Sequence, residues 1–126
     1  MKLLLAATFA FFIVTNLPVG AEIKPETRSF DSFWIKFKAA VAKGDKAAIA
    51  EMTKFPFDNG AKYQSKEEFI EQCGALFDKK TQKCFSKAKP VKEDNRDRYN
   101  VFCGEDIFGF AKVDGEYRFT YIGIND

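Results

Sequence analysis

The chain has 126 residues, with 20 lysines and arginines against 18 aspartates and glutamates, and it contains no histidine. This near-neutral balance gives no electrostatic case for nucleic acid as a partner, because nucleic-acid binding needs a clustered excess of positive charge. The three cysteines match no zinc spacing and imidazole ligands are missing, so we expect neither a metal nor another cofactor.

The first 21 residues have the order of a secretory signal peptide. A lysine at position 2 precedes an uncharged apolar run that ends at Val14, and small residues follow up to Ala21. The apolar run is shorter than the roughly 20 residues that a transmembrane helix needs. We therefore predict cleavage after Ala21, a flexible leader over 22–28 and a single domain over 29–126. We expect this domain to be secreted, into the bacterial periplasm or beyond, with no membrane contact after cleavage.

A helix is predicted from Phe30 onwards. Apolar residues fall at positions 30, 33, 34, 37, 40 and 41, which is the spacing of one helix face. Asp31 or Ser32 is placed to cap its start, and Gly44 is placed to end it in a left-handed conformation.

The aromatic residues of this helix are interpreted mainly as core. A stripe of apolar side chains at helical spacing is far more often buried packing than a binding surface. We expect Phe33 and Phe37 at the buried centre of the stripe. Trp34 lies about 100° further around the helix, which predicts a place at the margin of the stripe.

A second, shorter helix is predicted from Lys46 to about Thr53, with Asp45 as its cap. Pro56 disfavours helical geometry at Phe55, so the sequence FPF at 55–57 begins an extended segment. A turn over 58–60 and a short strand within 61–64 are expected to follow.

A third helix is predicted after Ser65. Ser65 and Glu68 form a capping box, in which each side chain bonds to the backbone N–H group of the other residue. The apolar face of this helix consists of Phe69, Ile70, Cys73, Leu76 and Phe77. Further helical turns are expected over 78–86.

The C-terminal third reads as an antiparallel meander. Short apolar and aromatic runs cover 99–103, 107–113 and 116–122. The dipeptide Asp114-Gly115 between the last two runs is the strongest short signal for a hairpin, because both turn residues must accept positive φ. Strand alternation predicts Tyr117, Phe119 and Tyr121 on one face of the last strand.

The three cysteines predict one disulfide bond and one remaining thiol, or a bond to another chain. We favour a Cys84–Cys103 bond over the other pairings, because it would join the end of the helical region to the first meander strand. The chain-entropy model gives such a bond about 3 kcal/mol of stabilisation. Cys73 lies on the apolar face of the third helix and is interpreted as a buried, unreactive thiol.

Lysines gather between the third helix and the first meander strand, at positions 79, 80, 83, 87, 89 and 92. One interpretation is a docking patch for an anionic partner, such as an acidic protein or a phosphorylated polymer. The other is a solvated helix face beside the compensating sequence EDNRDR at 93–98, and runs of charge are more commonly of this second kind.

Several stretches together resemble the nuclear transport factor 2-like superfamily, and in particular small secreted bacterial domains with no assigned function. They are FWIKFKAAVAKGDKAAIAEMTKFPF, SKEEFIEQCGALFD, CF at 84–85, VFCGEDIFGF and VDGEYRFTYI. The resemblance implies an α+β fold in which N-terminal helices pack on a curved antiparallel sheet, forming a cone with a pocket at its wide end. Enzymes of the superfamily place an Asp or an Asp-His pair in that pocket. Here histidine is absent and Asp58, Asp106 and Asp114 lie in or beside turns, so a catalytic role is not expected.

The candidate ligand contacts are Trp34, Tyr99, Tyr117 and Tyr121, because tyrosine and tryptophan combine an apolar ring with a polar group that seeks a partner. The alternative is that these side chains are core. We expect a secreted, non-enzymatic domain that binds a small molecule or another protein, with a homodimer also open.

Two alternatives remain open. The first is an isomerase-like or dehydratase-like pocket enzyme, which an internal pocket holding a polar residue would favour. The second is a secreted inhibitor or immunity-type protein, which a flat or protruding patch with exposed aromatic residues would favour.

Overall fold

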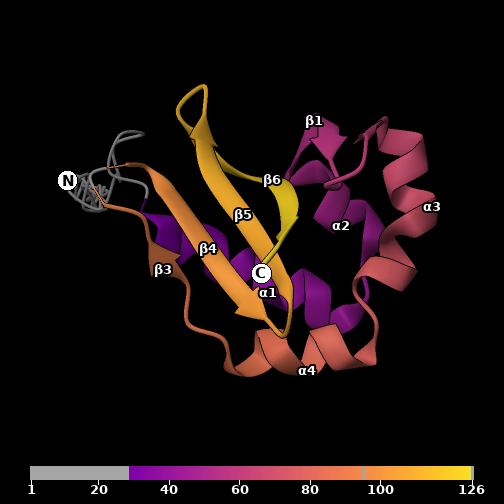
Figure 1. The fold of residues 1–126 in the computed structure, drawn as a ribbon, viewed down its shortest axis with the longest axis horizontal. Helices are drawn as coiled ribbons and strands as arrows, with labels where there is room; N and C mark the ends of the chain where they lie inside the picture. The colour runs from indigo at the N-terminus through magenta and orange to yellow at the C-terminus, as the bar shows by residue number, and fades with distance from the viewer. Residues whose placement is uncertain (1–28, 95, 126) are drawn as a thin grey trace, which may run out of the picture.

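The computed structural model describes residues 29–94 and 96–125, so the predicted signal peptide (1–21) and leader (22–28) lie outside the described residues. The helices are α1 (Phe30–Lys43), α2 (Lys46–Glu51), α3 (Lys66–Leu76) and α4 (Lys79–Lys87). The strands are β1 (Thr53–Asp58), β2 (Tyr63–Gln64), β3 (Val91–Lys92), β4 (Arg98–Cys103), β5 (Asp106–Val113) and β6 (Glu116–Ile124) (Figure 1). Within these ranges no helix is long and apolar enough to cross a membrane.

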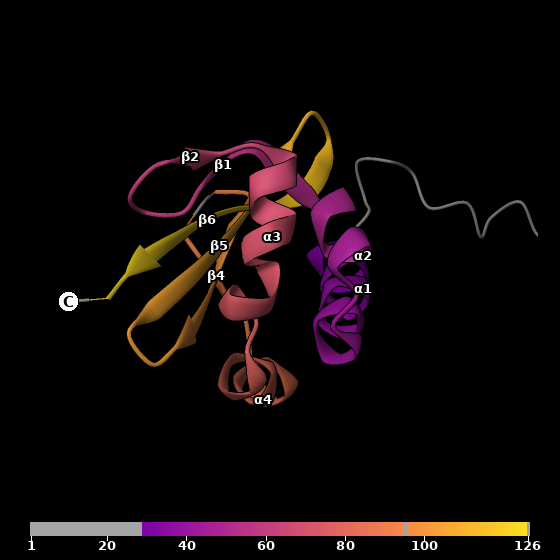
Figure 2. The same ribbon diagram turned by 90° about the vertical axis from the view of Figure 1, so that its right-hand side faces the viewer.

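The fold is α+β, with the helices gathered on one face of a six-stranded sheet (Figure 2). The strand order is β2-β1-β6-β5-β4-β3. Strands β4, β5 and β6 form the predicted antiparallel meander, and β3 and β2 pair antiparallel at the two edges. The sheet as a whole is mixed, because β1 pairs parallel with β6, a segment far away in the sequence. The opposite face of the sheet, here called the open face, carries no helix of the described residues (Figure 2).

Helix α1 begins at Phe30, at least two residues earlier than its predicted caps allow. Its N-cap is Ser29, whose side chain makes no capping hydrogen bond, so the prediction of Asp31 or Ser32 as the cap is wrong. Phe30 is drawn into the first turn because its ring is buried and stacks on Tyr99 with centroids 3.8 Å apart.

The predicted signals at other helix ends are confirmed. Gly44 ends α1 with φ +66°, and its N–H donates to the carbonyl of Val41. The Asp45 carboxylate accepts from the N–H of Ala48 at 3.1 Å and caps α2. Ser65 and Glu68 make both hydrogen bonds of the capping box that starts α3. The predicted hairpin is also present, with positive φ at both Asp114 and Gly115.

The centre of the core is a cluster of phenylalanine rings between the helices and the sheet. Phe37 has no exposed surface, and its ring lies 5.1 Å from that of Phe110 and 5.4 Å from that of Phe119. Phe33 is only partly buried, whereas Trp34 is 8 % exposed, so the expected order of burial for these two is wrong. The reason is α4, which packs against the Trp34 side of α1 and widens its buried face.

The Cys84–Cys103 disulfide is present and ties α4 to the end of β4. Cys73 is the unpaired cysteine and is 1 % exposed. Burial raises the pKa of its thiol to about 11, against a smaller opposing effect of the Lys46 ammonium group. At neutral pH Cys73 is therefore a protonated, packed side chain rather than a nucleophile.

Candidate functional site

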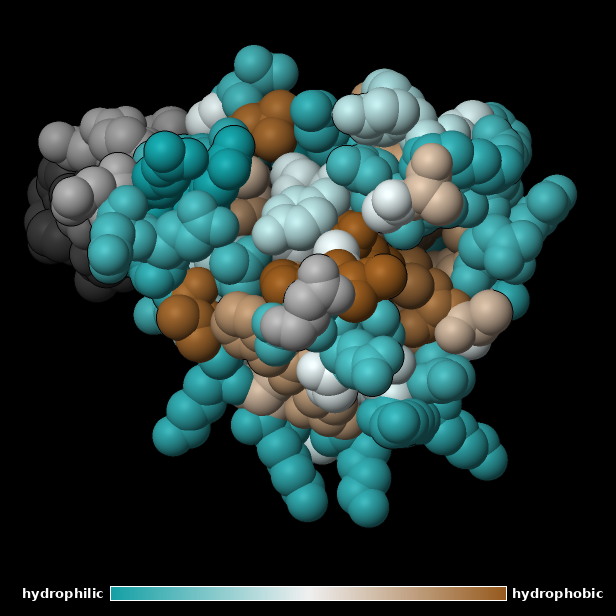
Figure 3. All heavy atoms as spheres, viewed as in Figure 1, coloured by the Kyte–Doolittle hydropathy of each residue, from teal (hydrophilic) through white to brown (hydrophobic). Residues whose placement is uncertain are grey.

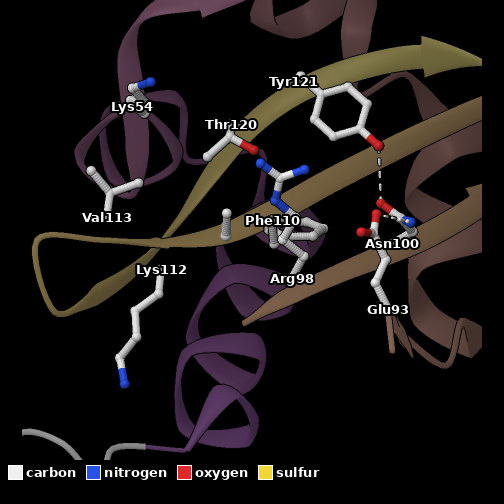
Figure 4. Close-up of a pocket in the computed structure, with 10 residues that line it drawn as sticks. Lys54, Glu93, Arg98, Asn100, Phe110, Lys112, Val113, Thr120 and Tyr121 are labelled. Atoms are coloured by element: carbon white, nitrogen blue, oxygen red, sulfur yellow. Dashed lines mark hydrogen bonds between the residues drawn. The ribbon is translucent and has the colours of Figure 1, made fainter. Parts of the chain in front are cut away.

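A hollow of about 280 Å³ lies on the open face of the sheet. Its lining includes Lys54 from β1, Arg98 and Asn100 from β4, Ala111 from β5, and Thr120 and Tyr121 from β6 (Figure 4). The pairing register explains the gathering, because Asn100, Gly109 and Tyr121 lie opposite one another across three neighbouring strands. Residues paired in this way project to the same face of a sheet.

Tyr121 reaches this face because β6 contains a bulge. Phe110 pairs with Phe119, yet Gly109 pairs with Tyr121, so Thr120 is an extra residue in β6. The bulge reverses the alternation of side chains that follows it. The prediction that Tyr121 shares a face with Tyr117 and Phe119 is therefore wrong. A glycine inside a strand, such as Gly109, is the sequence signal that could have indicated the irregularity.

The ring of Tyr121 lies over two glycines. A Cβ atom at Gly109 would lie 1.8 Å from Cε1 of Tyr121, and one at Gly123 would lie 3.3 Å from Cε2. Gly109 must stay without a side chain for the ring to lie flat across β5, whereas a Cβ atom at Gly123 would make only a tight contact with the edge of the ring. The glycines thus fix a platform of aromatic surface on the open face of the sheet.

A chain of hydrogen bonds holds this platform in place. The Tyr121 hydroxyl donates to Oδ1 of Asn100 at 3.1 Å, and Nδ2 of Asn100 donates to Oε1 of Glu93 at 3.1 Å (Figure 4). Burial raises the pKa of Tyr121, and the negative charge of Glu93 adds to that rise. The phenol therefore remains a proton donor near neutral pH and is not a base.

Two cations at the hollow, Arg98 and Lys54, are not paired with an acidic side chain, although the charge of Arg98 acts on the nearby Tyr121 hydroxyl. Neither Arg98 nor Lys54 makes a side-chain hydrogen bond or an ion pair with another residue in the described ranges. The side chain of Arg98 reaches across β5 toward Thr120 and Tyr121 (Figure 4). The Thr120 hydroxyl already donates to the carbonyl of Gly109 at 3.1 Å, so its oxygen is positioned by the backbone.

The other three predicted contact residues lie on the helix side of the sheet, around Phe30. Trp34 packs against Phe85 with ring centroids 5.5 Å apart. Tyr99 stacks on Phe30, and Tyr117 meets Phe30 edge-on at 5.3 Å. The structure therefore does not bring Trp34, Tyr99 and Tyr117 together with Tyr121.

The hydroxyl of Tyr117 points to the surface and donates to Oδ1 of Asp97 at 3.4 Å. Burial raises the pKa of Tyr117 to about 12, and the charge of Asp97 contributes to the rise. Such a phenol stays protonated at neutral pH, so Tyr117 is a packing residue with a hydrogen-bonded tip.

The space between helices and sheet, where a cone-shaped fold would hold its pocket, is filled by aromatic rings. Phe108 lies 4.9 Å from Phe85, and Phe110 lies 5.3 Å from Phe119, all four at 1 % exposure or less. Among the described residues, no group of three Cys, Asp or Glu side chains could hold a metal ion.

The residues that sequence reasoning missed are Lys54, Glu93, Arg98, Asn100 and Thr120. Glu93 and Arg98 belong to EDNRDR, for which the sequence alone suggests only compensating charge. Alternation along RYNVFC is the available signal, because it places Arg98 and Asn100 on the face of the strand away from the buried Val101. The pocket could not be found that way alone, since Lys54 comes from a distant part of the sequence.

No protein-family model and no curated protein matches the chain. A solved structure described as "Crystal structure of a de novo designed protein with curved beta-sheet" is similar to it. The two sequences are 16 % identical, the match covers 77 % of this chain and 96 % of that one, and the TM-score is 0.46.

Proposed function

We propose that the chain is a non-enzymatic binding domain whose ligand is a small organic carboxylate with a flat ring, bound on the open face of the sheet. The observation that carries this proposal is the unpaired Arg98 beside the flat ring of Tyr121, in a hollow of about 280 Å³. This volume suits a ligand at the small end of the usual range of about 300–1,000 Å³ for binding pockets.

Each part of the site has a role in this proposal. The planar guanidinium of Arg98 matches a carboxylate by two parallel hydrogen bonds. Lys54 adds a second positive charge without fixed geometry. The exposed face of Tyr121 offers a surface for the ring of the ligand, since aromatic pairs contribute about 0.5–1.5 kcal/mol beyond the area that they bury.

Two features favour binding over catalysis. Among the described residues, Glu93 is the only carboxylate that lines the hollow, and its Oε1 is held by Nδ2 of Asn100. The pKa of Tyr121 is raised, and its hydroxyl donates a hydrogen bond to Oδ1 of Asn100. The phenol is therefore not available as a base at neutral pH. The pocket-enzyme alternative also lacks support in the interior, which is filled by phenylalanine rings.

The test is a titration of the ¹⁵N-labelled protein with benzoate, followed by amide chemical shifts. We expect saturable shifts at Ala111 and Thr120 in the wild-type protein. The Arg98→Ala variant should lose saturation, while Arg96→Ala, which removes an arginine that does not line the hollow, should behave as wild type.

Two further arms define the ligand. Inorganic phosphate tests whether a bare anion is enough, and cyclohexylammonium tests whether charge sign matters. Equal shifts in wild type and Arg98→Ala, or equal response to cyclohexylammonium, would remove the basis for the proposal. Saturation by phosphate as tight as that by benzoate would exclude the role given to the Tyr121 ring.

Phe102 favours a second candidate function. In this alternative the chain docks onto a partner protein, as an inhibitor or an immunity-type protein does. This side chain is 45 % exposed on the open face, and Val91 on the neighbouring strand is 53 % exposed. Phe102→Ser leaves the Arg98 hollow intact, so it separates the two candidates. Loss of a protein partner with retained benzoate binding would favour docking.

We also propose that the domain is exported and that it is a cone-type member of the nuclear transport factor 2-like superfamily. The disulfide supports an oxidising compartment. Helices α1 to α3 followed by the β4–β6 meander support the superfamily. Mass spectrometry of the exported product tests the first point, with a mature chain starting at Glu22 expected and a chain retaining Met1 contradicting it.

A further inference from the structure

The positive charge of the protein is concentrated on two neighbouring helices. Helices α1 and α4 carry seven lysines, and Asp31 is their single acidic residue. The net charge of the whole sequence is only +2, so these helices hold a charge of +6 that the remaining residues offset elsewhere. The lysines are Lys36, Lys38, Lys43, Lys79, Lys80, Lys83 and Lys87.

These lysines make no ion pair in the described ranges, where the ion pairs involve Lys62, Lys66 and Arg118. The carboxylate of Asp78, the N-cap of α4, interacts with Lys80 and offsets part of this positive charge. Long hydrophilic side chains project from the edge of the molecule formed by α4 (Figure 3). The acidic residues of EDNRDR precede β4, whose opposite end is tied to α4 by the disulfide (Figure 1). The length of β4, roughly 17 Å at about 3.3 Å per residue, exceeds the screening length of about 8–10 Å in physiological salt. EDNRDR therefore does little to compensate the lysines of α4.

A hollow of about 320 Å³ lies between the same two helices. Its lining is mainly apolar, with Trp34, Ile35, Ala39 and Ala42 from α1, and Lys38, Gln82 and Ser86 complete it. Ile35 is 68 % exposed and adds a large apolar side chain to the rim of this hollow. Alanines at 39 and 42 keep the α1 wall of this hollow low, and the hollow is here called the α1–α4 groove.

The groove and the charge belong to one surface. Gln82 and Ser86 line the groove from α4, and Lys79 and Lys83 lie one turn away from them on the same helix face. Lys38 lines the groove from α1. The Cys84–Cys103 bond and the buried Phe85 hold α4 in this position.

We propose that the α1–α4 groove binds an acidic, amphipathic helical segment of another protein, with an apolar side chain seated against Ala39 and Ala42 and its carboxylates beside the lysines. This is the helix-in-groove mode of recognition, in which apolar anchors provide affinity and flanking charges provide orientation. The groove lies on the helix side of the molecule, so this inference is independent of the carboxylate site on the open face.

The shape of the surface selects a protein segment over the other anionic partners. A membrane surface requires several large apolar side chains that protrude beside the lysines, whereas here α1 exposes one, Ile35, and α4 exposes none. Nucleic-acid sites on protein surfaces commonly combine positive charge with aromatic side chains on which bases stack, but Trp34, the aromatic residue that lines this hollow, is buried.

The experiment measures fluorescence anisotropy of a labelled 14-residue peptide. One face of the peptide carries Glu and the other carries Leu at helical spacing. We expect saturable binding that weakens as sodium chloride is raised from about 50 to about 300 mM, because screening shortens the reach of the lysines. A second peptide with Ser in place of every Leu should bind at least about tenfold more weakly, since it lacks the apolar anchors.

Two variants and one matched control locate the site. Lys79→Glu/Lys83→Glu reverses the charge beside the groove, and Ala39→Glu places a carboxylate in it. Each should weaken binding by at least about tenfold through like-charge repulsion. The control Lys92→Glu/Arg96→Glu makes the same change in net charge away from the groove and should change binding less than about twofold. All the substituted positions are exposed, so folding is expected to be retained, and circular dichroism checks it.

The outcomes separate the possible partners. Equal weakening by the control pair and by Lys79→Glu/Lys83→Glu would reduce the surface to non-specific charge and overturn the proposal. Equal binding of the Leu and Ser peptides would overturn the role of the groove. Binding to phosphatidylglycerol vesicles or to duplex DNA, with no binding of the Leu peptide, would assign the lysines to a membrane or to nucleic acid instead.

Discussion

The ring of Tyr121 occupies the space that a side chain at Gly109 would need. Its Cε1 atom lies 1.8 Å from the position of a Cβ atom built on Gly109. The two residues sit opposite each other on β6 and β5 at the bulge. The shape of the open face therefore depends on the lack of a side chain at Gly109 as well as on the Tyr121 ring.

Gly109→Ala should destabilise the protein by about 1–3 kcal/mol, because the added methyl group forces the Tyr121 ring off its platform. Chemical denaturation measures the change in the free energy of unfolding. In a Tyr121→Ala background the same substitution should cost much less, since the clash is gone. Additive effects in this double-mutant cycle would show that the strain at Gly109 has another source.

Phe37→Ala should lower the free energy of unfolding by about 3–5 kcal/mol, as expected for removing a large ring from a fully buried position. Phe33→Ala is the matched comparison, one turn earlier on α1 and only partly buried, and should cost clearly less. Urea denaturation of both variants checks the order. A Phe33 variant less stable than the Phe37 variant would contradict the helix register described above.

Replacing Cys84 and Cys103 by serine should cost about 3 kcal/mol of stability by the chain-entropy model. A reductant should lower the stability of the wild-type protein by the same amount. It should cause no further loss in the double variant, which has no disulfide to reduce. Non-reducing peptide mapping should join the Cys84 and Cys103 peptides. A Cys73-containing crosslink in that map would contradict the pairing.

Stability should fall as pH rises from about 9 to about 11, in part through Cys73. Burial raises the pKa of this thiol to about 11 in the folded protein, above its ordinary value of 9.0. The unfolded chain therefore loses the proton first, so the contribution is complete below pH 9 and is lost as pH rises through the folded pKa. The measurement is the difference between wild type and Cys73→Ala in urea denaturation at about pH 8 and about pH 10.5, because this difference removes the contributions that the two proteins share.

If both proteins lose the same stability between these pH values, Cys73 does not titrate as described. The rate of iodoacetamide labelling gives a second check. It should be slow at about pH 8 in the native protein and fast after denaturation, since the thiol is buried and protonated.

Local signals predict local structure well in this chain. The caps at Asp45 and Ser65, the end of α1 at Gly44 and the Asp114-Gly115 turn each depend on a few neighbouring residues, and all are present. The Cys84–Cys103 bond is also predictable, because its alternatives are few.

The failures share a different cause, which is contact between distant segments. Trp34 is more buried than expected and Phe33 less, because α4 packs on the Trp34 side of α1. Tyr121 changes face because of one extra residue, Thr120, in a pairing that alternation alone cannot detect. The parallel pairing of β1 with β6 brings Lys54 to the same hollow as Arg98, and no local pattern encodes it.

Strand β6 follows all the other strands in chain order, yet it stands inside the sheet, between β1 and β5. Phe119 on this strand contacts Phe57 from β1 at 4.8 Å and Phe37 from α1 at 5.4 Å, so it joins the two halves of the core. A growing chain on the ribosome lacks that junction until β6 has been made. Folding of the domain therefore waits for β6, and a premature stop before Glu116 would leave two unconnected pieces of sheet rather than a slightly shortened domain.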